Sequence, residues 1–222
     1  MNPTESSSPS SVFPASPAEG IVFVVDDDLS VRRSLRQLIG WAGWQPAICA
    51  SAKEFLALPR PAVASCLVLD VGLPDINGLE VQKLVADRIE MPIIFITGGG
   101  DVPVTVRAMK AGAVEFLTKP FEDDVLLNAI RDALKYSTTA IRRQTELQAL
   151  RDCYSSLTRR EREVMTLVVS GRLNKQVGAE LGISEITVKV HRGNMMEKMH
   201  AHSFLELVKM AVRLGLMPAT KG

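Results

Sequence analysis

The chain has 222 residues, of which 46% are hydrophobic, and its formal net charge is +1. This length suits one large or two modest domains, and the apolar content suffices for packed cores, which excludes a wholly disordered chain. No apolar run approaches the roughly 20 residues of a membrane span, and no basic segment precedes an apolar one at the N-terminus. We therefore expect a cytoplasmic protein with no membrane partner.

Charge is unevenly distributed along the chain. Residues 1–135 carry 12 Lys and Arg against 17 Asp and Glu, a net charge of −5, whereas residues 136–222 carry 14 against 8, a net charge of +6. This asymmetry favours two parts with different tasks, the second with a charge that suits nucleic acid, and a chance asymmetry is the alternative. The three cysteines show no metal-site spacing, which favours buried thiols in a reducing compartment.

Residues 1–19 are mainly Ser, Pro and Ala, so we predict a disordered tail there. Strand-like and helix-like patterns then alternate over residues 20–136. The strand-like runs span residues 21–25, 44–50, 66–69, 93–96 and 115–118, and the helical patterns span 30–41, 51–58, 78–87, 102–111 and 122–136. Five such units predict an α/β domain with a doubly wound, five-stranded parallel sheet. Ser51 and Glu54 predict a capping box, and Pro46 favours an edge position for the second strand.

Residues 137–157 lack Gly and Pro and are mostly polar, which predicts a helical linker. Leu127, Leu134 and Ile141 lie seven residues apart, so the last helix of the α/β domain could continue as a weak coiled-coil seam. Gln144 and Gln148 interrupt that repeat, and a solvated linker helix fits the pattern at least as well. The sequence leaves both alternatives open.

Residues 158–218 carry only helical signals, which predict an all-α domain of four helices. Thr158 and Glu161 form a capping box for the first helix. Asn174, Ser184 and Ser203 are the expected caps of the other three. The second and third helices are joined by a turn that contains a glycine, which is typical of a helix-turn-helix motif.

Four strand-like runs end on residues that could handle a phosphoryl group. Asp26 and Asp27 follow the first run, Asp70 the third, Thr97 the fourth and Lys119 the fifth. Because the carboxyl ends of parallel strands share one edge of a sheet, we expect these side chains to converge. Neighbouring carboxylates repel one another unless a cation lies among them, and an all-oxygen site favours Mg²⁺.

A carboxylate in such a site can be the nucleophile and form an aspartyl-phosphate. Asp70 is alone on its strand, so we assign it as the nucleophile and the Asp26–Asp27 pair to the metal. Lys119 supplies a compact positive charge for a phosphoryl oxygen. Asp28 lies just before a helix and is expected to be its N-cap.

At this point the sequence resembles a family. The segments Val-Val-Asp-Asp at 24–27, Leu-Asp-Val-Gly-Leu-Pro-Asp-Ile-Asn-Gly at 69–78, Ile-Thr-Gly at 96–98 and Thr-Lys-Pro-Phe at 118–121 resemble the receiver domain of two-component response regulators. Residues 96–121 resemble the FixJ-type branch. The resemblance implies that Asp70 is the phosphoacceptor and that Lys119 contacts the phosphoryl group.

The resemblance also implies a Mg²⁺ site. Asp27 and Asp70 would bind the ion directly, together with the backbone carbonyl of Gly72, and Asp26 would act through an intervening water. A magnesium-dependent phosphatase of the haloacid dehalogenase type is the main rival, because it also forms an aspartyl-phosphate. It would want a second Asp where this chain has Gly72, and it would leave the C-terminal module unexplained.

A switch is implied as well. Thr97 would hydrogen-bond the phosphoryl group and move toward Asp70, while Phe116 would rotate inward behind it. The change would reach the face formed by helix 102–111, strand 115–118 and helix 122–136, and that face would pair two copies of the chain.

The C-terminal part resembles the LuxR/NarL-type helix-turn-helix domain, through residues 157–164, Asn-Lys at 174–175 and residues 183–194. In the predicted helix 185–199, Val188, His191, Met195 and Met199 form a core-facing stripe. The opposite face carries residues that could enter a major groove or contact phosphates. We assign Lys189 and Val190 to the groove, and Lys175, Thr187 and Arg192 to the phosphates.

The combined reading is a phosphorylation-activated transcription factor, not an enzyme beyond magnesium-assisted self-phosphorylation and slow self-dephosphorylation. Its expected partners are a sensor histidine kinase, promoter DNA, a second copy of the chain when phosphorylated, and RNA polymerase. The remaining rival is a constitutive DNA-binding protein with a vestigial receiver. The complete set of Asp27, Asp70, Thr97 and Lys119 argues against that rival.

Overall fold

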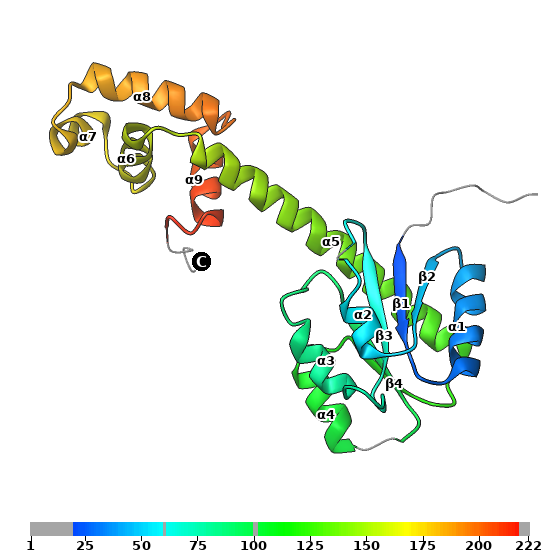
Figure 1. Cartoon of the computed structure of the whole chain (residues 1–222). Helices are drawn as coiled ribbons and strands as arrows, with labels where there is room; N and C mark the ends of the chain where they lie inside the picture. The colour runs from blue at the N-terminus through cyan, green and yellow to red at the C-terminus, as the bar shows by residue number, and fades with distance from the viewer. Residues whose placement is uncertain (1–19, 60, 100–101, 218–222) are drawn as a thin grey trace, which may run out of the picture. The chain divides into compact units, whose positions relative to one another are not determined.

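The computed structural model describes residues 20–59, 61–99 and 102–217 (Figure 1). The chain divides into two compact units, with the boundary between Ile141 and Arg142. This boundary lies inside the segment predicted as a linker. The predicted disordered tail, residues 1–19, and the predicted end of the second domain at residue 218 lie outside the described residues.

The first unit is built on a parallel sheet whose five described strands follow the order β2-β1-β3-β4-β5. The strands are β1 (Ile21–Val25), β2 (Gln45–Cys49), β3 (Ser65–Asp70), β4 (Ile93–Thr97) and β5 (Glu115–Thr118). This topology confirms the predicted doubly wound α/β fold. β2 lies at an edge of the sheet, as Pro46 indicated.

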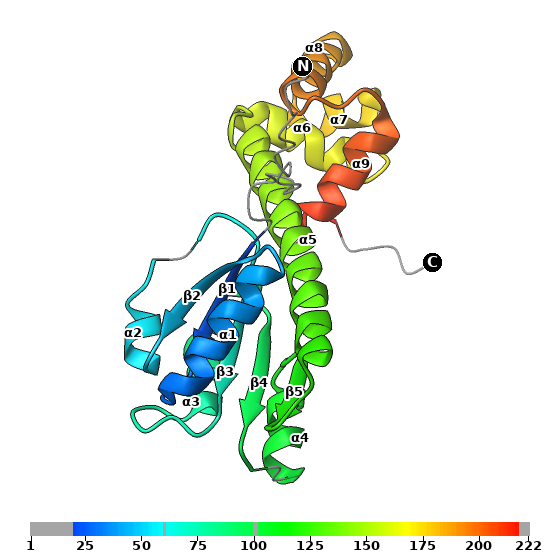
Figure 2. The same cartoon turned by 90° about the vertical axis from the view of Figure 1, so that its right-hand side faces the viewer.

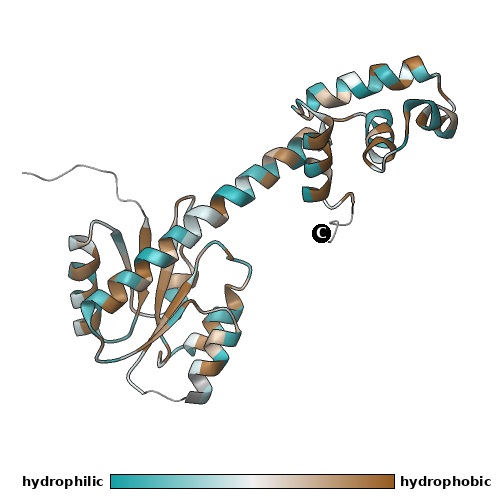
Figure 3. Cartoon of the chain, turned by 180° about the vertical axis from the view of Figure 1, so that it is seen from behind, coloured by the Kyte–Doolittle hydropathy of each residue, from teal (hydrophilic) through white to brown (hydrophobic). Residues whose placement is uncertain are grey.

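Helices cover both faces of the sheet (Figure 2). They are α1 (Leu29–Trp41), α2 (Ala52–Leu56), α3 (Gly78–Leu84), α4 (Val102–Lys110) and α5 (Asp123–Ser155). α1 and the first part of α5 pack on one face around Val24, Ile39 and Ile130. α2, α3 and α4 pack on the other face around Phe55 and Val81. Strands covered on both faces must be largely apolar, which explains why brown predominates over teal in the strands of Figure 3.

The two predicted helix caps of the first unit have different outcomes. Asp28 caps α1, and its Oδ1 accepts a hydrogen bond of 2.6 Å from the backbone N–H of Ser30. Ser51 Oγ accepts from Glu54 N at 3.2 Å, as a capping box requires. Glu54 Oε2, however, accepts from Ala50 N at 2.7 Å instead of from Ser51 N. The second half of the predicted capping box is therefore wrong.

Helix α5 is continuous from Asp123 to Ser155, so the predicted helix 122–136 and most of the predicted linker form one element. In its first part Leu126 and Ile130 are buried against the sheet. Near its end Leu150 is buried in the core of the second unit. Residues 142–146 between these anchors are exposed, as expected of a solvated linker helix.

The second unit contains the four predicted helices and the end of α5. The four are α6 (Arg159–Val169), α7 (Asn174–Leu181), α8 (Glu185–Lys198) and α9 (Phe204–Arg213). One cluster packs Leu150 of α5 with Met165, Met195 and Leu207. A smaller cluster, centred on Val188, packs α6, α7 and α8 together.

Three of the four predicted caps in this unit are confirmed. Thr158 and Glu161 form a complete capping box, and Ser184 and Ser203 cap α8 and α9. The prediction for Asn174 is wrong, because Asn174 is the first residue of α7 and its N-cap is Leu173. The physical reason is a competing partner: Asn174 Oδ1 accepts a hydrogen bond of 2.7 Å from Arg192 Nη1.

Two glycines permit close backbone approaches. A Cβ atom on Gly78, at the start of α3, would lie 2.6 Å from the carbonyl oxygen of Asp70. A Cβ atom on Gly178, in α7, would lie 2.7 Å from the carbonyl oxygen of Ile183 in the turn before α8. Glycine therefore sets the distance between α3 and the end of β3, and the distance between α7 and the helix-turn-helix turn.

We expect Gly78→Ala to destabilise the first unit by about 1–3 kcal/mol, the usual cost of overpacking. The backbone oxygen that the new methyl group meets cannot rotate away. Urea unfolding followed by tryptophan fluorescence measures the effect, because both tryptophans, Trp41 and Trp44, lie in this unit. Gly98→Ala is the matched control, since a Cβ atom at Gly98 has nothing within 4 Å. Equal stability of the two variants would contradict this account.

Candidate phosphoryl site and nucleic-acid interface

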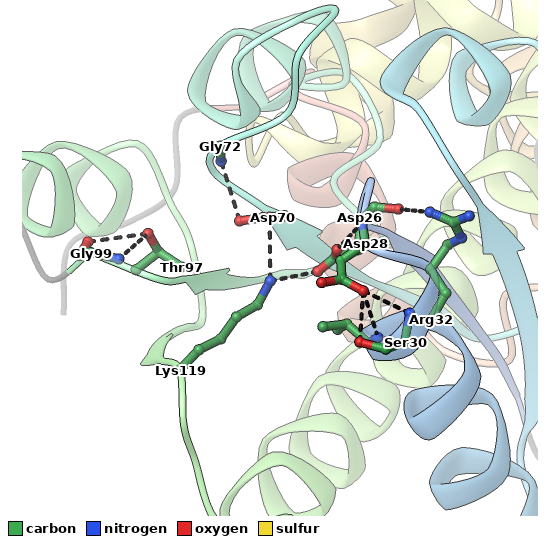
Figure 4. A network of polar contacts seen from close by, with 10 residues as sticks. Asp26, Asp28, Ser30, Arg32, Asp70, Gly72, Thr97, Gly99 and Lys119 are labelled. Atoms are coloured by element: carbon green, nitrogen blue, oxygen red, sulfur yellow. Dashed lines mark hydrogen bonds and ion pairs between the residues drawn. The ribbon is translucent and has the colours of Figure 1, made fainter.

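The predicted phosphoryl-site residues lie together at the carboxyl edge of the sheet. Asp26 follows β1, Asp70 ends β3, Thr97 ends β4 and Lys119 follows β5. In register, Val25 pairs with Leu69, and Thr97 pairs with Thr118. The parallel topology therefore brings four separate segments to one point, as Figure 4 shows.

Lys119 lies between two carboxylates. Its Nζ donates to Asp26 Oδ2 at 2.6 Å and to Asp70 Oδ2 at 3.3 Å (Figure 4). The backbone N–H of Lys119 also donates to the carbonyl of Thr97 at 2.7 Å, which fixes the start of the lysine against β4. The amine is thus held where negative charge is concentrated.

Burial and charge act against each other in this cluster. Asp26 is 0% exposed, and this burial raises the pKa of its carboxyl above the usual range although the hydrogen bonds from Lys119 and Asp28 oppose the shift. Burial lowers the pKa of the Lys119 amine, but its hydrogen bond and ion pair with Asp26, together with Asp70, outweigh it and raise that pKa overall. Lys119 therefore stays charged, and its hydrogen bond to Asp26 limits the rise in the pKa of that carboxyl.

Backbone contacts orient the buried carboxylate. Asp26 Oδ1 accepts from Asp28 N at 2.8 Å. The Asp26 carbonyl accepts from Arg32 Nη1 at 2.7 Å, so α1 is tied to the end of β1. Nothing in the local pattern of α1 distinguishes Arg32 from Arg33, and the sequence analysis missed this contact.

The carboxylates fit a divalent cation. Asp26, Asp27 and Asp70 each offer an oxygen, and these oxygens lie within 4.8 Å of one another. Asp26 and Asp70 are buried, whereas Asp27 is exposed. An all-oxygen donor set that keeps one side open to solvent suits Mg²⁺, which retains several waters.

Two contacts shape the surroundings of Asp70. Its Oδ1 accepts from Gly72 N at 3.2 Å, so the loop after β3 turns back over the carboxylate. Asp75, farther along that loop, accepts from the backbone N–H groups of Ala52 and Lys53 at the start of α2, at 3.3 and 3.0 Å. Asp75 therefore anchors the loop, a role that the sequence analysis missed because the partners lie more than 20 residues away.

The two predicted switch residues lie on neighbouring strands. Thr97 is buried at the end of β4, and its hydroxyl donates to Gly99 O at 3.1 Å and accepts from Gly99 N at 3.2 Å. Phe116 in β5 is half-buried, and its ring lies 6.1 Å from that of Phe95, its register partner. The structure thus places Thr97 beside the site and Phe116 one strand away.

Helix α8 has one packed and one open face. Val188, Met195 and Met199 are buried as predicted, and His191 is half-buried. Lys189 and Val190 are exposed, and Lys189 Nζ lies 3.5 Å from Glu185 Oε1 one turn earlier. The open face is therefore available to a large partner.

The sequence analysis overlooked one residue of the open face of α8. Ile186 is 74% exposed and lies one turn before Val190, which is 55% exposed. The available signal was the four-residue spacing of Ile186 and Val190, which places two aliphatic side chains together on the face opposite the core-facing stripe. Ile186 and Val190 give the open face an apolar strip beside Lys189.

Three residues predicted to contact phosphates have different surroundings. Lys175 is exposed on α7. Thr187 Oγ1 lies 2.8 Å from the hydroxyl of Ser184, within the cap of α8. Arg192 is half-buried and donates to Asn174.

An ion pair between the buried Glu161 and the half-exposed Lys198 holds α8 against α6. Glu161 is 3% exposed, and its Oε2 accepts from Lys198 Nζ at 2.7 Å and from Thr158 N at 2.8 Å. Burial raises the pKa of the Glu161 carboxyl, but these hydrogen bonds outweigh it and hold the pKa below its usual value. The ionised carboxylate is therefore part of the folded structure.

In the described part of the chain, no helix is both long and apolar enough to cross a membrane. The first unit is a doubly wound α/β domain with an acidic cluster at the carboxyl edge of its sheet, and the second unit is a helical module that contains a helix-turn-helix. Residues 22–131 match the family described as the response regulator receiver domain, and residues 155–211 match the LuxR family of bacterial regulatory proteins.

Relatives carry the same arrangement over nearly the whole chain. Nodulation protein W of Bradyrhizobium diazoefficiens is 49% identical over 199 residues, covering 89% of this chain and 88% of that protein. Transcriptional regulatory protein FixJ of the same organism is 41% identical, covering 90% and 98%. A solved structure of the response regulator StyR is 46% identical with a TM-score of 0.79, covering 88% and 100%.

The chain therefore belongs to the FixJ/NarL-type two-component response regulators, which regulate transcription. Both matching families are regulatory, so the family of the chain is that of a regulator and not of a haloacid dehalogenase-type phosphatase.

Acid should destabilise the second unit through Glu161. Because the folded pKa of Glu161 is lowered, its ionised form contributes stability above about pH 4.5, its usual value, and that contribution is lost as pH falls through the folded pKa. We expect Glu161→Gln to cost about 1.5–3 kcal/mol at neutral pH and to flatten the acid side of the stability profile. Urea unfolding followed by circular dichroism between pH 3 and 7 measures both effects. An acid-side slope equal to that of the wild type would contradict this role.

Proposed function

We propose that Asp70 accepts a phosphoryl group from a sensor histidine kinase and that this modification controls DNA binding by the second unit. The observation that carries the proposal is the position of Asp70 Oδ2, 3.3 Å from the Lys119 amine, within a cluster of three carboxylates. This arrangement supplies a nucleophile, a cation for the phosphoryl oxygens and ligands for a metal ion.

The transfer step uses Asp70 as the nucleophile. A carboxylate oxygen of Asp70 attacks the phosphorus of a phosphohistidine on the kinase, forming an O–P bond as the P–N bond breaks. The imidazole nitrogen keeps the electron pair and takes a proton from solvent. Lys119 then moves part of its interaction from Asp70 to the transferred phosphoryl oxygens, which carry more negative charge.

We propose that Asp26, Asp27, Asp70 and the carbonyl of Gly72 hold Mg²⁺. When bound, the ion supplies positive charge that offsets the carboxylates and the phosphoryl oxygens. Asp26 has to be ionised for this purpose, and its ion pair with Lys119 favours the ionised form against the effect of burial. The Gly72 and Asp75 contacts keep the loop after β3 in place.

The proposed switch couples the site to a surface. The Thr97 hydroxyl, which bonds to Gly99, turns to the phosphoryl group, and Phe116 moves inward behind it. The face formed by α4, β5 and α5 then pairs with the same face of a second copy. A nearly complete change of state needs about 5.5 kcal/mol of differential stabilisation, which several charge-assisted hydrogen bonds to a phosphoryl group can supply.

The proposed output is promoter binding through α8. Lys189 and Val190 contact base edges in the major groove, and Lys175 and Thr187 contact phosphates. Two copies bind two half-sites because one module of this size binds weakly.

We propose a cytoplasmic location, with RNA polymerase as a further partner. We also propose a receiver domain over 20–136, a linker over 137–157 and a DNA-binding domain over 158–218.

The experiment compares Asp70→Asn with Asp28→Asn. Each removes one carboxylate near the site, but Asp28 caps α1, and asparagine is an equally good N-cap. With acetyl phosphate and Mg²⁺, mass spectrometry should find the phosphoryl adduct on wild type and Asp28→Asn and not on Asp70→Asn. Light scattering should show dimers only where the adduct forms. A stable adduct of equal yield on Asp70→Asn, or phosphorylated wild type that stays monomeric, would refute the proposal.

A further inference from the structure

Arg192 joins three helices of the second unit. It lies in α8, where its Nη1 donates to Asn174 Oδ1 at 2.7 Å, and Asn174 is the first residue of α7. Its guanidinium carbon lies 5.8 Å from the ring centroid of Phe204, the first residue of α9. The side chain thus connects the middle of α8 to the amino-terminal ends of two other helices.

The contact with Asn174 gives the start of α7 a partner from another helix. The side chain of Leu173, the N-cap of α7, makes no capping hydrogen bond, and asparagine is a residue that ordinarily favours capping positions. Asn174 instead gives its oxygen to a charged donor, and such hydrogen bonds are stronger than neutral ones. Gln176 Oε1 also accepts a hydrogen bond of 2.9 Å from the backbone N–H of Leu173, so the start of α7 is held both by its own sequence and by α8.

The same region carries the proposed phosphate contact. Lys175 follows Asn174 in α7, and Lys175 and Arg192 line one hollow of about 460 Å³ together with Arg172, Glu185 and Phe204. The Phe204 ring lies 5.8 Å from the guanidinium carbon, and Asn174 Oδ1 accepts a hydrogen bond from one of the guanidinium nitrogens. A movement of Arg192 would shift the end of α7 that carries Lys175.

We infer that Arg192 is a positioning residue, which keeps Lys175 on α7 in register with the base-contacting residues Lys189 and Val190 on α8. This inference rests on the proposed DNA-binding function, and it replaces the phosphate contact expected for Arg192 from the sequence. Its role is to make phosphate binding and base reading occur together, so that affinity is gained only on the correct sequence.

The slope of affinity against salt separates positioning from direct phosphate contact. Losing one phosphate contact lowers the slope of log affinity against log salt by about one, whereas losing a positioning contact leaves the slope unchanged. The phosphodonor-treated full chain is titrated by fluorescence anisotropy into a duplex that the wild type selects from a random pool, and into a scrambled duplex. Salt is varied over about 50–200 mM.

We expect Arg192→Met to weaken binding to the selected duplex about ten-fold, equivalent to about 1.4 kcal/mol, with an unchanged slope. Binding to the scrambled duplex should change less, so the ratio of the affinity for the selected duplex to that for the scrambled duplex (the specificity ratio) falls. A loss of stability alone would not lower this ratio, because the protein that remains folded would bind both duplexes as before. Asn174→Ala should give a similar loss, and the double variant should lose no more than either single variant. Lys175→Met is the matched control and should lower the slope by about one.

Phe204→Leu provides an uncharged second test should Arg192→Met fold poorly, because it removes the ring over the guanidinium without altering any charge. It should lower the specificity ratio with the slope unchanged. A slope lowered by about one in Arg192→Met, or losses that simply add in the double variant, would overturn the positioning role alone. A wild type that selects no duplex would overturn the proposed DNA-binding function and this inference with it.

Discussion

The ion pair between Lys119 and the carboxylates of Asp26 and Asp70 is the interaction on which the first unit depends. A parallel sheet with apolar strands can collect polar groups only at its ends, and here it collects three carboxylates at one edge. Asp26 is fully buried there, which would be costly for an unpaired charge. Lys119 offsets this cost from the end of β5, and the amine remains within reach of any group added to Asp70.

The contacts around Asp70 explain how a phosphoryl group on this one side chain would alter the arrangement of several segments. The contacts of Lys119, Thr97 and the loop after β3 all converge on Asp70 or its immediate neighbours. A phosphoryl group would draw on the same donors, so the interactions that hold the resting arrangement would be redistributed. Gly78 packs closely against the Asp70 carbonyl, so the backbone there has little room to move when a group is added to Asp70.

The second unit also pairs a buried carboxylate with a lysine, and there the pair holds two helices together. Glu161 is a buried carboxylate that a lysine neutralises, and this pair fastens α8 to α6. Arg192 fastens α8 to α7 and α9 by a hydrogen bond and a ring contact. With its inner face fixed at its middle and at its carboxyl end, α8 presents Ile186, Lys189 and Val190 on a rigid outer face, as readout of base edges requires.

Much of this architecture could be predicted from the sequence because its signals are local. The strand-like runs located all five strands, and the residue after four of them located Asp26, Asp70, Thr97 and Lys119 at one edge. The errors arose where a distant partner competed with a local one. Asn174 has the side chain of a cap, but Arg192, 18 residues later, takes its oxygen.

Burial is the other property that the linear pattern could not supply. Asp26 and Asp27 are adjacent and chemically identical, yet one is buried and the other exposed. The difference follows from the direction in which β1 ends relative to β3 and α1. The anchoring of the loop after β3 by Asp75 was missed for the same reason, because α2 approaches it only in the folded unit.

The central claim is that the occupancy of Asp70 controls DNA binding by the same chain. The most direct measurement is the affinity of the full chain for a selected duplex as a function of the fraction phosphorylated, both determined on the same samples. The account predicts that affinity rises with the phosphorylated fraction and stays at the basal level in Asp70→Asn. An affinity that is independent of phosphorylation, or equally high in Asp70→Asn, would contradict it.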